Sequence, residues 1–232
     1  MLKVVLFFYT SIMFTCLHLA SEVSYSHVDC NGVAFDYKLI QLMNFPNGTF
    51  IEVGAHDGIS QSNTKRLEEF HGWKGILIEP SENLYANLVS NRPHSRCFLC
   101  ALGSFTENNT YAVGDFNGGM MSSINSSRLN QTADKVVLVR SLQSILDEVD
   151  LKHINFFSLD TEGYELNILH GIDFNKTTFD YLLIEIYPEQ FEDIVSFLKN
   201  HGYELVENFS NYSLKTNPLW DGTHNDYLFK KN

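Results

Sequence analysis

The chain has 232 residues and a formal net charge of −12, with 16 lysines and arginines against 28 aspartates and glutamates. Its length suits one domain, and a composition of 44% apolar and 19% charged residues provides for an ordinary hydrophobic core, which excludes a disordered chain. The basic residues are scattered, whereas a duplex-binding domain has a basic face or stripe, so we expect no nucleic acid as the main partner.

The N-terminus has the pattern of a secretory signal peptide, with Lys3 as the positive charge and a largely apolar stretch over residues 4–19. We expect residues 1–20 to be a signal peptide and residues 21–232 to be the functional domain. A retained signal anchor is the alternative, because His18 is a poor residue beside the cleavage site, and a buried N-terminal helix is a third reading. Contact with a membrane is expected only through such an anchor.

Two further features bear on the cellular compartment. Beyond the leader three cysteines remain, and in a secreted protein we expect a disulfide bond from Cys30 to Cys97 or Cys100. Cys97 and Cys100 are not expected to share a zinc ion, because residues three apart on a strand point to opposite faces. Seven Asn-x-Ser/Thr triplets agree with a secreted glycoprotein: Asn47, Asn108, Asn125, Asn130, Asn175, Asn208 and Asn211.

Strands and helices alternate along the chain, which predicts an α/β fold with a mostly parallel sheet covered by helices on both faces. In chain order we expect a strand at 49–53, a helix at 62–70, a strand at 75–78, a helix at 83–90, a strand at 96–102, a hairpin region formed by 110–116 and 135–140, a helix at 141–149, strands at 154–159 and 181–186, a helix from 191 to 198, and closing strands at 203–209 and 227–230.

The first chemical signal is the turn from Glu52 to Gly58, which lies between a strand and a helix, where ligand loops of open α/β sheets are found. Gly54 allows a sharp turn close to a ligand, and Gly58 lets the helix begin close to the strand. The loop amides can hold a carboxylate and Glu52 suits an ammonium group, which together match the amino-acid end of S-adenosylmethionine (SAM). An NAD-dependent enzyme is disfavoured, because Gly-x-Gly-x-x-Gly would need a glycine in place of His56. A glycine turn without a ligand is the structural alternative.

Acidic residues follow two other predicted strands. Glu79 lies 25 residues after Gly54, near the spacing at which an acid meets ribose hydroxyls, although an exposed strand-end acid before a proline is the simpler alternative. Three acids in six residues, Asp160, Glu162 and Glu165, follow the strand expected beside the first. Such an arrangement is unfavourable without a nearby cation, which a sulfonium or a metal ion would supply. For Glu165 we favour a purely structural role in the first turn of a helix.

In this order, the segments 50–58, 62–64, 73–80 and 158–166 resemble the FkbM-type methyltransferases, although His56 stands where that family often has asparagine. The resemblance implies a Rossmann-like class I methyltransferase fold with a seven-stranded sheet, SAM as the cofactor, and O-methylation of a hydroxyl on a glycan or small molecule. It also implies that Ala101 and Leu102 lie near the adenine. The other predicted cofactor-binding residues are Glu52, Gly54, Ala55, His56, Asp57, Gly58, Ser62, Asn63, Glu79 and Pro80.

Methyl transfer to a hydroxyl needs a group that takes up its proton. The candidate catalytic residues are Asp160, Glu162, Glu185 and His56, with a carboxylate or the imidazole as general base. In a second reading the three acids bind a divalent ion. We favour the metal-free reading, because the acids do not have the spacing of a recognised metal motif. A third reading is that Glu162 and Glu185 only fix loop amides and an adjacent hydroxyl.

A different class of function also stays open, namely a secreted or luminal SAM-fold binding or signalling protein without catalysis. The presence of Glu52, Gly54, Gly58 and Glu79 disfavours it, since a protein without a working site has no need of them.

Overall fold

The computed structural model describes residues 24–117, 124, 134–218 and 220–232. The predicted leader at 1–20 and the triplets at Asn125 and Asn130 lie outside the described residues. In the part of the chain that is described, no helix has both the length and the hydrophobicity to cross a lipid bilayer.

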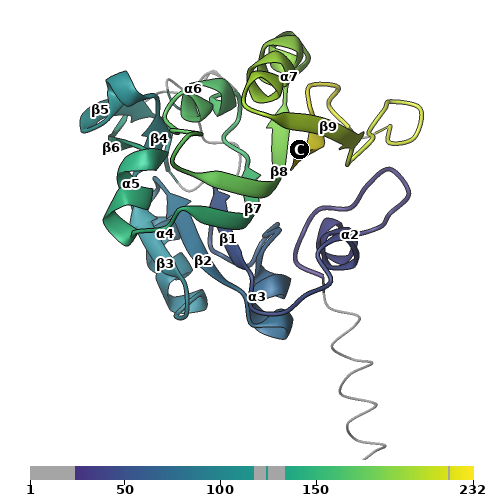
Figure 1. Cartoon of the computed structure of the whole chain (residues 1–232), viewed down its shortest axis with the longest axis horizontal. Coiled ribbons are helices and arrows are strands. Elements are labelled where there is room, and N and C mark those ends of the chain that lie inside the picture. Colours follow the sequence, from purple (N-terminus) through teal and green to yellow (C-terminus); the bar gives the residue numbers. More distant parts are fainter. Residues whose placement is uncertain (1–23, 118–123, 125–133, 219) are drawn as a thin grey trace, which may run out of the picture.

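A seven-stranded sheet forms the centre of the molecule (Figure 1), with the strand order β3-β2-β1-β7-β8-β10-β9. All neighbours from β3 to β8 pair in parallel, whereas β10 is antiparallel to both β8 and β9. The strand order reverses at β1, and ligands of open α/β sheets bind at such a switch point. The strands are β1 (Thr49–Val53), β2 (Lys74–Glu79), β3 (Arg96–Leu99), β7 (His153–Leu159), β8 (Thr178–Ile186), β9 (Tyr203–Asn208) and β10 (Asn225–Lys231).

Helices cover both faces of this sheet, as the alternation of strands and helices predicts. Successive strand residues point to opposite faces, so that Ile51 packs in the core cluster with α5, α6 and α7, and its neighbour Phe50 packs in the cluster with α2, α3 and α4. Leu182 and Leu183 divide in the same way. The helices are α2 (Phe35–Leu42), α3 (Lys65–His71), α4 (Glu82–Asn91), α5 (Leu142–Val149), α6 (Glu165–Leu169) and α7 (Phe191–Asn200), with short 3-10 turns η1 (Phe105–Glu107) and η2 (Pro188–Gln190).

A second, three-stranded sheet has the order β4-β6-β5. β5 (Thr110–Gly114) pairs antiparallel with β6 (Lys135–Ser141), which confirms the predicted hairpin region. The strand predicted at 96–102 is divided at Cys100, because its first part extends the large sheet as β3 and its second part, β4 (Ala101–Gly103), pairs with β6 instead. An apolar run does not reveal that the backbone changes partners within it. Helix α2 was also not predicted, and α6 was anticipated only as the helical turn expected at Glu165.

The expected disulfide bond from Cys30 to Cys97 or Cys100 is wrong, since all three are free thiols in this structure. The backbone N–H of Cys30 donates to the carbonyl of Ser210, which lies beside β10, whereas Cys97 lies on the edge strand β3. Five strand-to-strand steps separate β3 from β10, or about 24 Å at ~4.8 Å a step. A disulfide bond tolerates at most about 7 Å between Cα atoms.

Candidate functional site

The turn after β1 brings the ends of three neighbouring strands together. Gly54 has φ +79°, and a Cβ added to it would lie 2.0 Å from the carbonyl oxygen of Asp160, at the end of β7. The amides of Gly54 and Ala55 both donate to the carbonyl of Ile78, near the end of β2, at 3.1 Å. Glycine is therefore required at position 54 by the close approach of β7 as well as by its positive φ.

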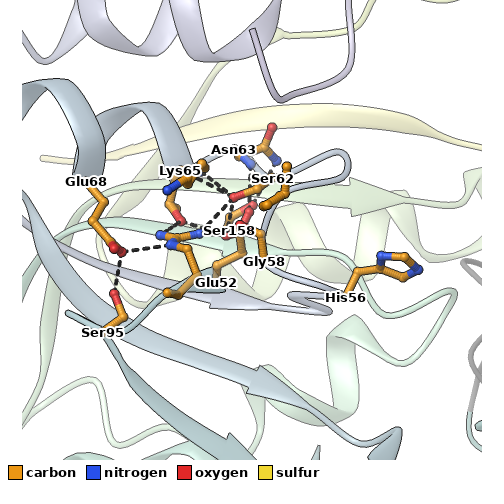
Figure 2. A network of polar contacts seen from close by, with 12 residues as sticks. Glu52, His56, Gly58, Ser62, Asn63, Lys65, Glu68, Ser95 and Ser158 are labelled. Carbon is orange, nitrogen blue, oxygen red and sulfur yellow. Dashed lines mark hydrogen bonds and ion pairs between the residues drawn. The ribbon is translucent and has the colours of Figure 1, made fainter. Parts of the chain in front are cut away.

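Glu52 is buried beneath the turn and holds the segment before α3. Its carboxylate accepts hydrogen bonds from Ser62 Oγ at 2.8 Å, from the Asn63 amide at 2.6 Å and from Thr64 Oγ1 at 2.6 Å (Figure 2). These contacts delay the start of α3 to Lys65, three residues after the predicted start. We expected the carboxylate of Glu52 to meet an ammonium group of the ligand, but donors of the protein itself occupy it. Glu52 also does not line the cavity beside the turn.

Arg92, at the end of α4, was missed by the sequence analysis. Its side chain is fully buried, donates from Nε to Glu68 at 2.8 Å, and lies 3.7 Å from Glu52. Its other donors reach the Gly58 carbonyl, Ser62 Oγ and Thr64 Oγ1 at 3.0–3.2 Å. The sequence alone did not indicate this role, because an arginine that directly follows a helix is usually exposed to solvent.

Helix α4 also explains why position 58 is a glycine. Its φ is +80°, and an added Cβ would lie 2.6 Å from Leu88 and 2.7 Å from the Arg92 side chain. The close approach at this glycine is therefore to α4, rather than to the helix that follows the turn. Asp57 also has a local role, since its carboxylate accepts from the amides of Ile59 and Ser60 at 2.9 and 2.7 Å.

Most turn amides that we expected to hold a carboxylate are used within the protein. Besides those of Gly54 and Ala55, the amide of His56 donates to Glu79, and that of Gly58 donates to the Ala55 carbonyl. The imidazole of His56 points away from the Glu52 network in Figure 2. Its Nδ1 is buried, lies 3.5 Å from Asp57 Oδ1, and has no hydrogen-bond partner among the described residues.

A cavity opens beside the turn, at the carboxyl ends of β1, β2 and β7. Five predicted site residues do not line it: Glu52, Asp57, Gly58, Asn63 and Glu185. The predicted residues that do line it are Gly54, Ala55, His56, Ser62, Glu79, Pro80, Ala101, Leu102, Asp160 and Glu162. Phe116 and Ile124, which we did not predict, add to the apolar wall near Ala101.

Glu79 ends β2 and is buried in the wall of this cavity. Its two carboxylate oxygens accept hydrogen bonds from the backbone amides of His56 and Ser81, each at 2.9 Å. Burial raises the pKa of Glu79 to about 7, although the two amide hydrogen bonds favour the charged form. These amides fix the carboxylate in one orientation at the cavity.

A carboxylate cluster lies where β7 and β8 end. One oxygen from each of Asp160, Glu162 and Glu185 lies within 4.8 Å of the other two. Tyr187 donates its hydroxyl to Glu162 at 2.8 Å, and His224 Nε2 lies 3.1 Å from Glu185 Oε1. Burial, and then repulsion by nearby carboxylates beginning with Asp160, raises the pKa of Glu185 well above its usual range.

Glu165 has the structural role that we favoured for it. It is the first residue of α6 and is fully buried. Its Oε1 accepts from the amide and hydroxyl of Thr161 at 2.8 and 2.9 Å and from the Gly163 amide at 3.2 Å. Glu165 therefore holds the loop that carries Asp160 and Glu162.

Comparison with known proteins identifies this arrangement. Residues 52–205 match the family model of the methyltransferase FkbM domain. The chain belongs to the FkbM methyltransferase family. The resemblance seen in the sequence is thereby confirmed, and so is the Rossmann-like fold of SAM-dependent methyltransferases, in its seven-stranded, mostly parallel form.

Solved structures that resemble this FkbM domain do so at low sequence identity. The FkbM methyltransferase from Methylobacillus flagellatus KT has a TM-score of 0.50 and 17% identity, over 78% of this chain and 43% of that chain. A fibrillarin pre-rRNA processing protein from Methanococcus jannaschii has a TM-score of 0.48 and 11% identity, over 81% and 67%. Aeropyrum pernix fibrillarin, solved with natively bound SAM, has a TM-score of 0.47 and 11% identity, over 80% and 67%. No curated protein gives a significant match.

The cavity of this FkbM domain has both apolar and polar lining residues, as a ligand such as SAM requires. Ala101, Leu102 and Phe116 form an apolar wall at one side, and the turn with His56 contributes polar groups. The buried, oriented carboxylate of Glu79 is ready to accept hydrogen bonds from ligand hydroxyls. The chemical character of these residues therefore fits the cofactor of the family.

Proposed function

We propose that this FkbM domain is a SAM-dependent O-methyltransferase that acts on a hydroxyl of a glycan or small molecule in the secretory pathway. The observation that carries the proposal is the single cavity lined by the glycine turn, by Glu79 and by the carboxylates Asp160 and Glu162. When bound, SAM supplies a methyl group on a positively charged sulfur.

Each wall of the cavity would hold a different part of the cofactor. Glu79 would accept hydrogen bonds from the ribose hydroxyls, and its fixed orientation limits the entropy lost on binding. Ala101 and Leu102 would lie against the adenine, while the turn with His56 and Ser62 would border the methionine end. Glu52 and Arg92 would act indirectly, by supporting the segment that carries Ser62.

The acidic side of the cavity favours a hydroxyl as the methyl acceptor. A carboxylic acid or phosphate would be repelled by Asp160 and Glu162, whereas a neutral hydroxyl can donate a hydrogen bond to either carboxylate. The acceptor's proton would pass to one of these carboxylates or to the imidazole of His56, whose Nδ1 has no hydrogen-bond partner within the described residues. An alcohol is a poor nucleophile until this proton begins to leave.

Calorimetric titration of the purified chain with SAM, its demethylated product and NAD tests the cofactor assignment. We expect the first two to bind and NAD to fail. A subsequent screen of glycan and small-molecule hydroxyls with methyl-labelled SAM separates an enzyme from a binding protein. SAM binding without transfer to any hydroxyl, together with a specific protein partner, would favour the non-catalytic alternative.

For the compartment, the proposal is supported by the leader pattern and by exposed glycosylation triplets. The side chains of Asn47, Asn175 and Asn211 are exposed. Those of Asn108 and Asn208 are engaged in the fold, through hydrogen bonds from the amides of Ser141 and Asn211. Expression of the full chain in a eukaryotic cell should yield a protein whose mass falls on glycosidase treatment. A chain without residues 1–20 is the control, and an unglycosylated full chain would contradict the assignment.

A further inference from the structure

We propose that Asp160, Glu162 and Glu185 form a binding site for one divalent cation of the oxygen-seeking class, such as Mg²⁺, Mn²⁺ or Ca²⁺. The site lies at the ends of β7 and β8, beside the cavity that Asp160 and Glu162 line. The catalytic role of the ion rests on the proposed function, whereas its binding does not.

The geometry of the three carboxylates suits a single ion. Their oxygens lie within 4.8 Å of one another, and two oxygens on opposite sides of an ion are about 4.2 Å apart for Mg²⁺ and about 4.8 Å apart for Ca²⁺. Glu162, at φ +58°, and Gly163, at φ +100°, turn the chain directly after Asp160. Glu185 comes from the adjacent parallel strand, so acids from two separate segments of the chain meet at one point.

Glu185 supplies an independent observation that points to a ligand. Only 4% of the residue is exposed, and Oε1 is paired with His224. Its other oxygen, Oε2, is buried and accepts no hydrogen bond from any described residue. A buried polar atom without a partner destabilises the fold. Nothing in the methyl-transfer chemistry proposed above uses this oxygen, whereas coordination of a cation would satisfy it.

The electrostatic surroundings also favour a cation. Asp226, opposite Glu185 on β10, and Glu165 on α6 add two carboxylates to the three of the cluster. The charges of these carboxylates repel one another at the cluster, and Lys38 partly offsets that of Asp226. Among the described groups near the cluster, His224 is paired with Glu185 and can carry a positive charge. A bound divalent ion would relieve this repulsion.

The ion would change how the acceptor loses its proton. An acceptor hydroxyl whose oxygen binds the cation has a lowered pKa, so the O–H bond breaks more easily and the oxygen keeps the electron pair. The proton then passes to His56, which lines the same cavity and is not a ligand of the ion. Acceptors with two neighbouring oxygens, such as vicinal diols, would chelate the ion and be favoured.

Titration of the full, SAM-free chain with Mn²⁺, followed by electron paramagnetic resonance, tests the site without any enzymatic activity. We expect one Mn²⁺ per chain, displaced by Mg²⁺ or Ca²⁺. Glu185→Gln keeps the shape of the side chain and should weaken Mn²⁺ binding at least tenfold. Glu204→Gln, an exposed acid on β9, is the matched control and should bind as the wild type does.

Circular dichroism checks that each variant is folded, and Glu162→Gln replaces Glu185→Gln if the latter is not. The proposal is overturned if the wild type binds no Mn²⁺, or if both glutamine variants bind it with unchanged affinity. SAM binding, measured in parallel, separates the two proposals. Bound Mn²⁺ without SAM binding would refute the proposed function alone, and methyl transfer undiminished by a chelator, without Mn²⁺ binding, would refute the cation site alone.

Discussion

Glu79 couples the stability of the empty domain to its affinity for a cofactor. Its pKa is about 7 in the folded protein and 4.5 in the reference state, so over this range the folded chain keeps a proton that the unfolded chain has released. The free energy of unfolding therefore falls as the pH rises from about 4.5 to about 7. Ionised Glu79 accepts stronger hydrogen bonds from hydroxyls, so SAM affinity should rise over the upper part of the same range.

We predict that SAM binds about 3–10 times more tightly at pH 8 than at pH 6, since a charged hydrogen bond exceeds a neutral one by roughly 1 kcal/mol. Calorimetry measures the affinity, and thermal melting of the empty protein should show the opposite trend. Glu79→Gln should flatten the affinity profile and weaken the trend in stability, to which Glu185 and Asp226 also contribute, whereas Glu82→Gln, exposed on α4, should leave both profiles unchanged. If SAM affinity still depends on pH in the Glu79→Gln variant, the titrating group is not Glu79.

Gly54 and Gly32 have the same φ but different surroundings, so substituting each one distinguishes the cost of backbone strain from the cost of a steric clash. Gly54 and Gly32 both have φ +79°, but an added Cβ meets the Asp160 carbonyl oxygen at 2.0 Å in the first case and nothing within 4 Å in the second. We predict that Gly54→Ala lowers the free energy of unfolding by roughly 3–5 kcal/mol and Gly32→Ala by about 1–2 kcal/mol, as measured in urea. Equal losses would show that the contact between the turn and β7 is relaxed easily.

At the scale of elements, α4 supports the turn through Arg92. Arg92→Met leaves the buried carboxylates of Glu52 and Glu68 without their cation, which should cost about 3–5 kcal/mol in unfolding experiments. SAM affinity should fall as well, because Ser62 and the Gly58 carbonyl lose a donor. In Gly58→Val the new side chain would clash with Leu88 and Arg92 of the same helix, so we expect it to destabilise the fold as well as to impair SAM binding.

A double-mutant cycle tests this assignment. Glu68→Gln removes one of the two charges that Arg92 neutralises, so adding it to Arg92→Met should recover part of the lost stability. Arg92→Lys keeps the charge without the planar fork of donors and should be intermediate. Strict additivity of Arg92→Met and Glu68→Gln would mean that the two residues stabilise the protein independently.

At the scale of the whole molecule, the sheet keeps Cys30 apart from Cys97 and Cys100. We predict that peptide mapping without reduction finds no bond between Cys30 and either Cys97 or Cys100. Alkylation of the folded protein should modify Cys100 last, because it is buried and burial raises its pKa to about 12. A mapped link from Cys30 to Cys97 would require the N-terminal segment to dock elsewhere than beside β10.

The sequence by itself determined the parts of this protein that depend on short-range pattern. Short continuous apolar runs predicted the parallel strands, and helical spacing predicted the helices between them. The glycine turn after β1 and the acid at the end of β2 were found because topology puts the ends of parallel strands at one edge of the sheet. These local signals were sufficient for the family, the fold and the lining of the cavity by Gly54, Glu79 and Asp160.

Only the tertiary structure decided which side chains meet. Glu52 had the residue type for a ligand, but its partners Ser62, Thr64 and Arg92 come from other segments and use its carboxylate internally. The distance between Cys30 and Cys97 depends on strand order, which a cysteine count does not contain. The meeting of Asp160 and Glu162 with Glu185 likewise depends on β7 lying beside β8. In each case the free energy of a side chain depends on neighbours that only the packing of the sheet brings within reach.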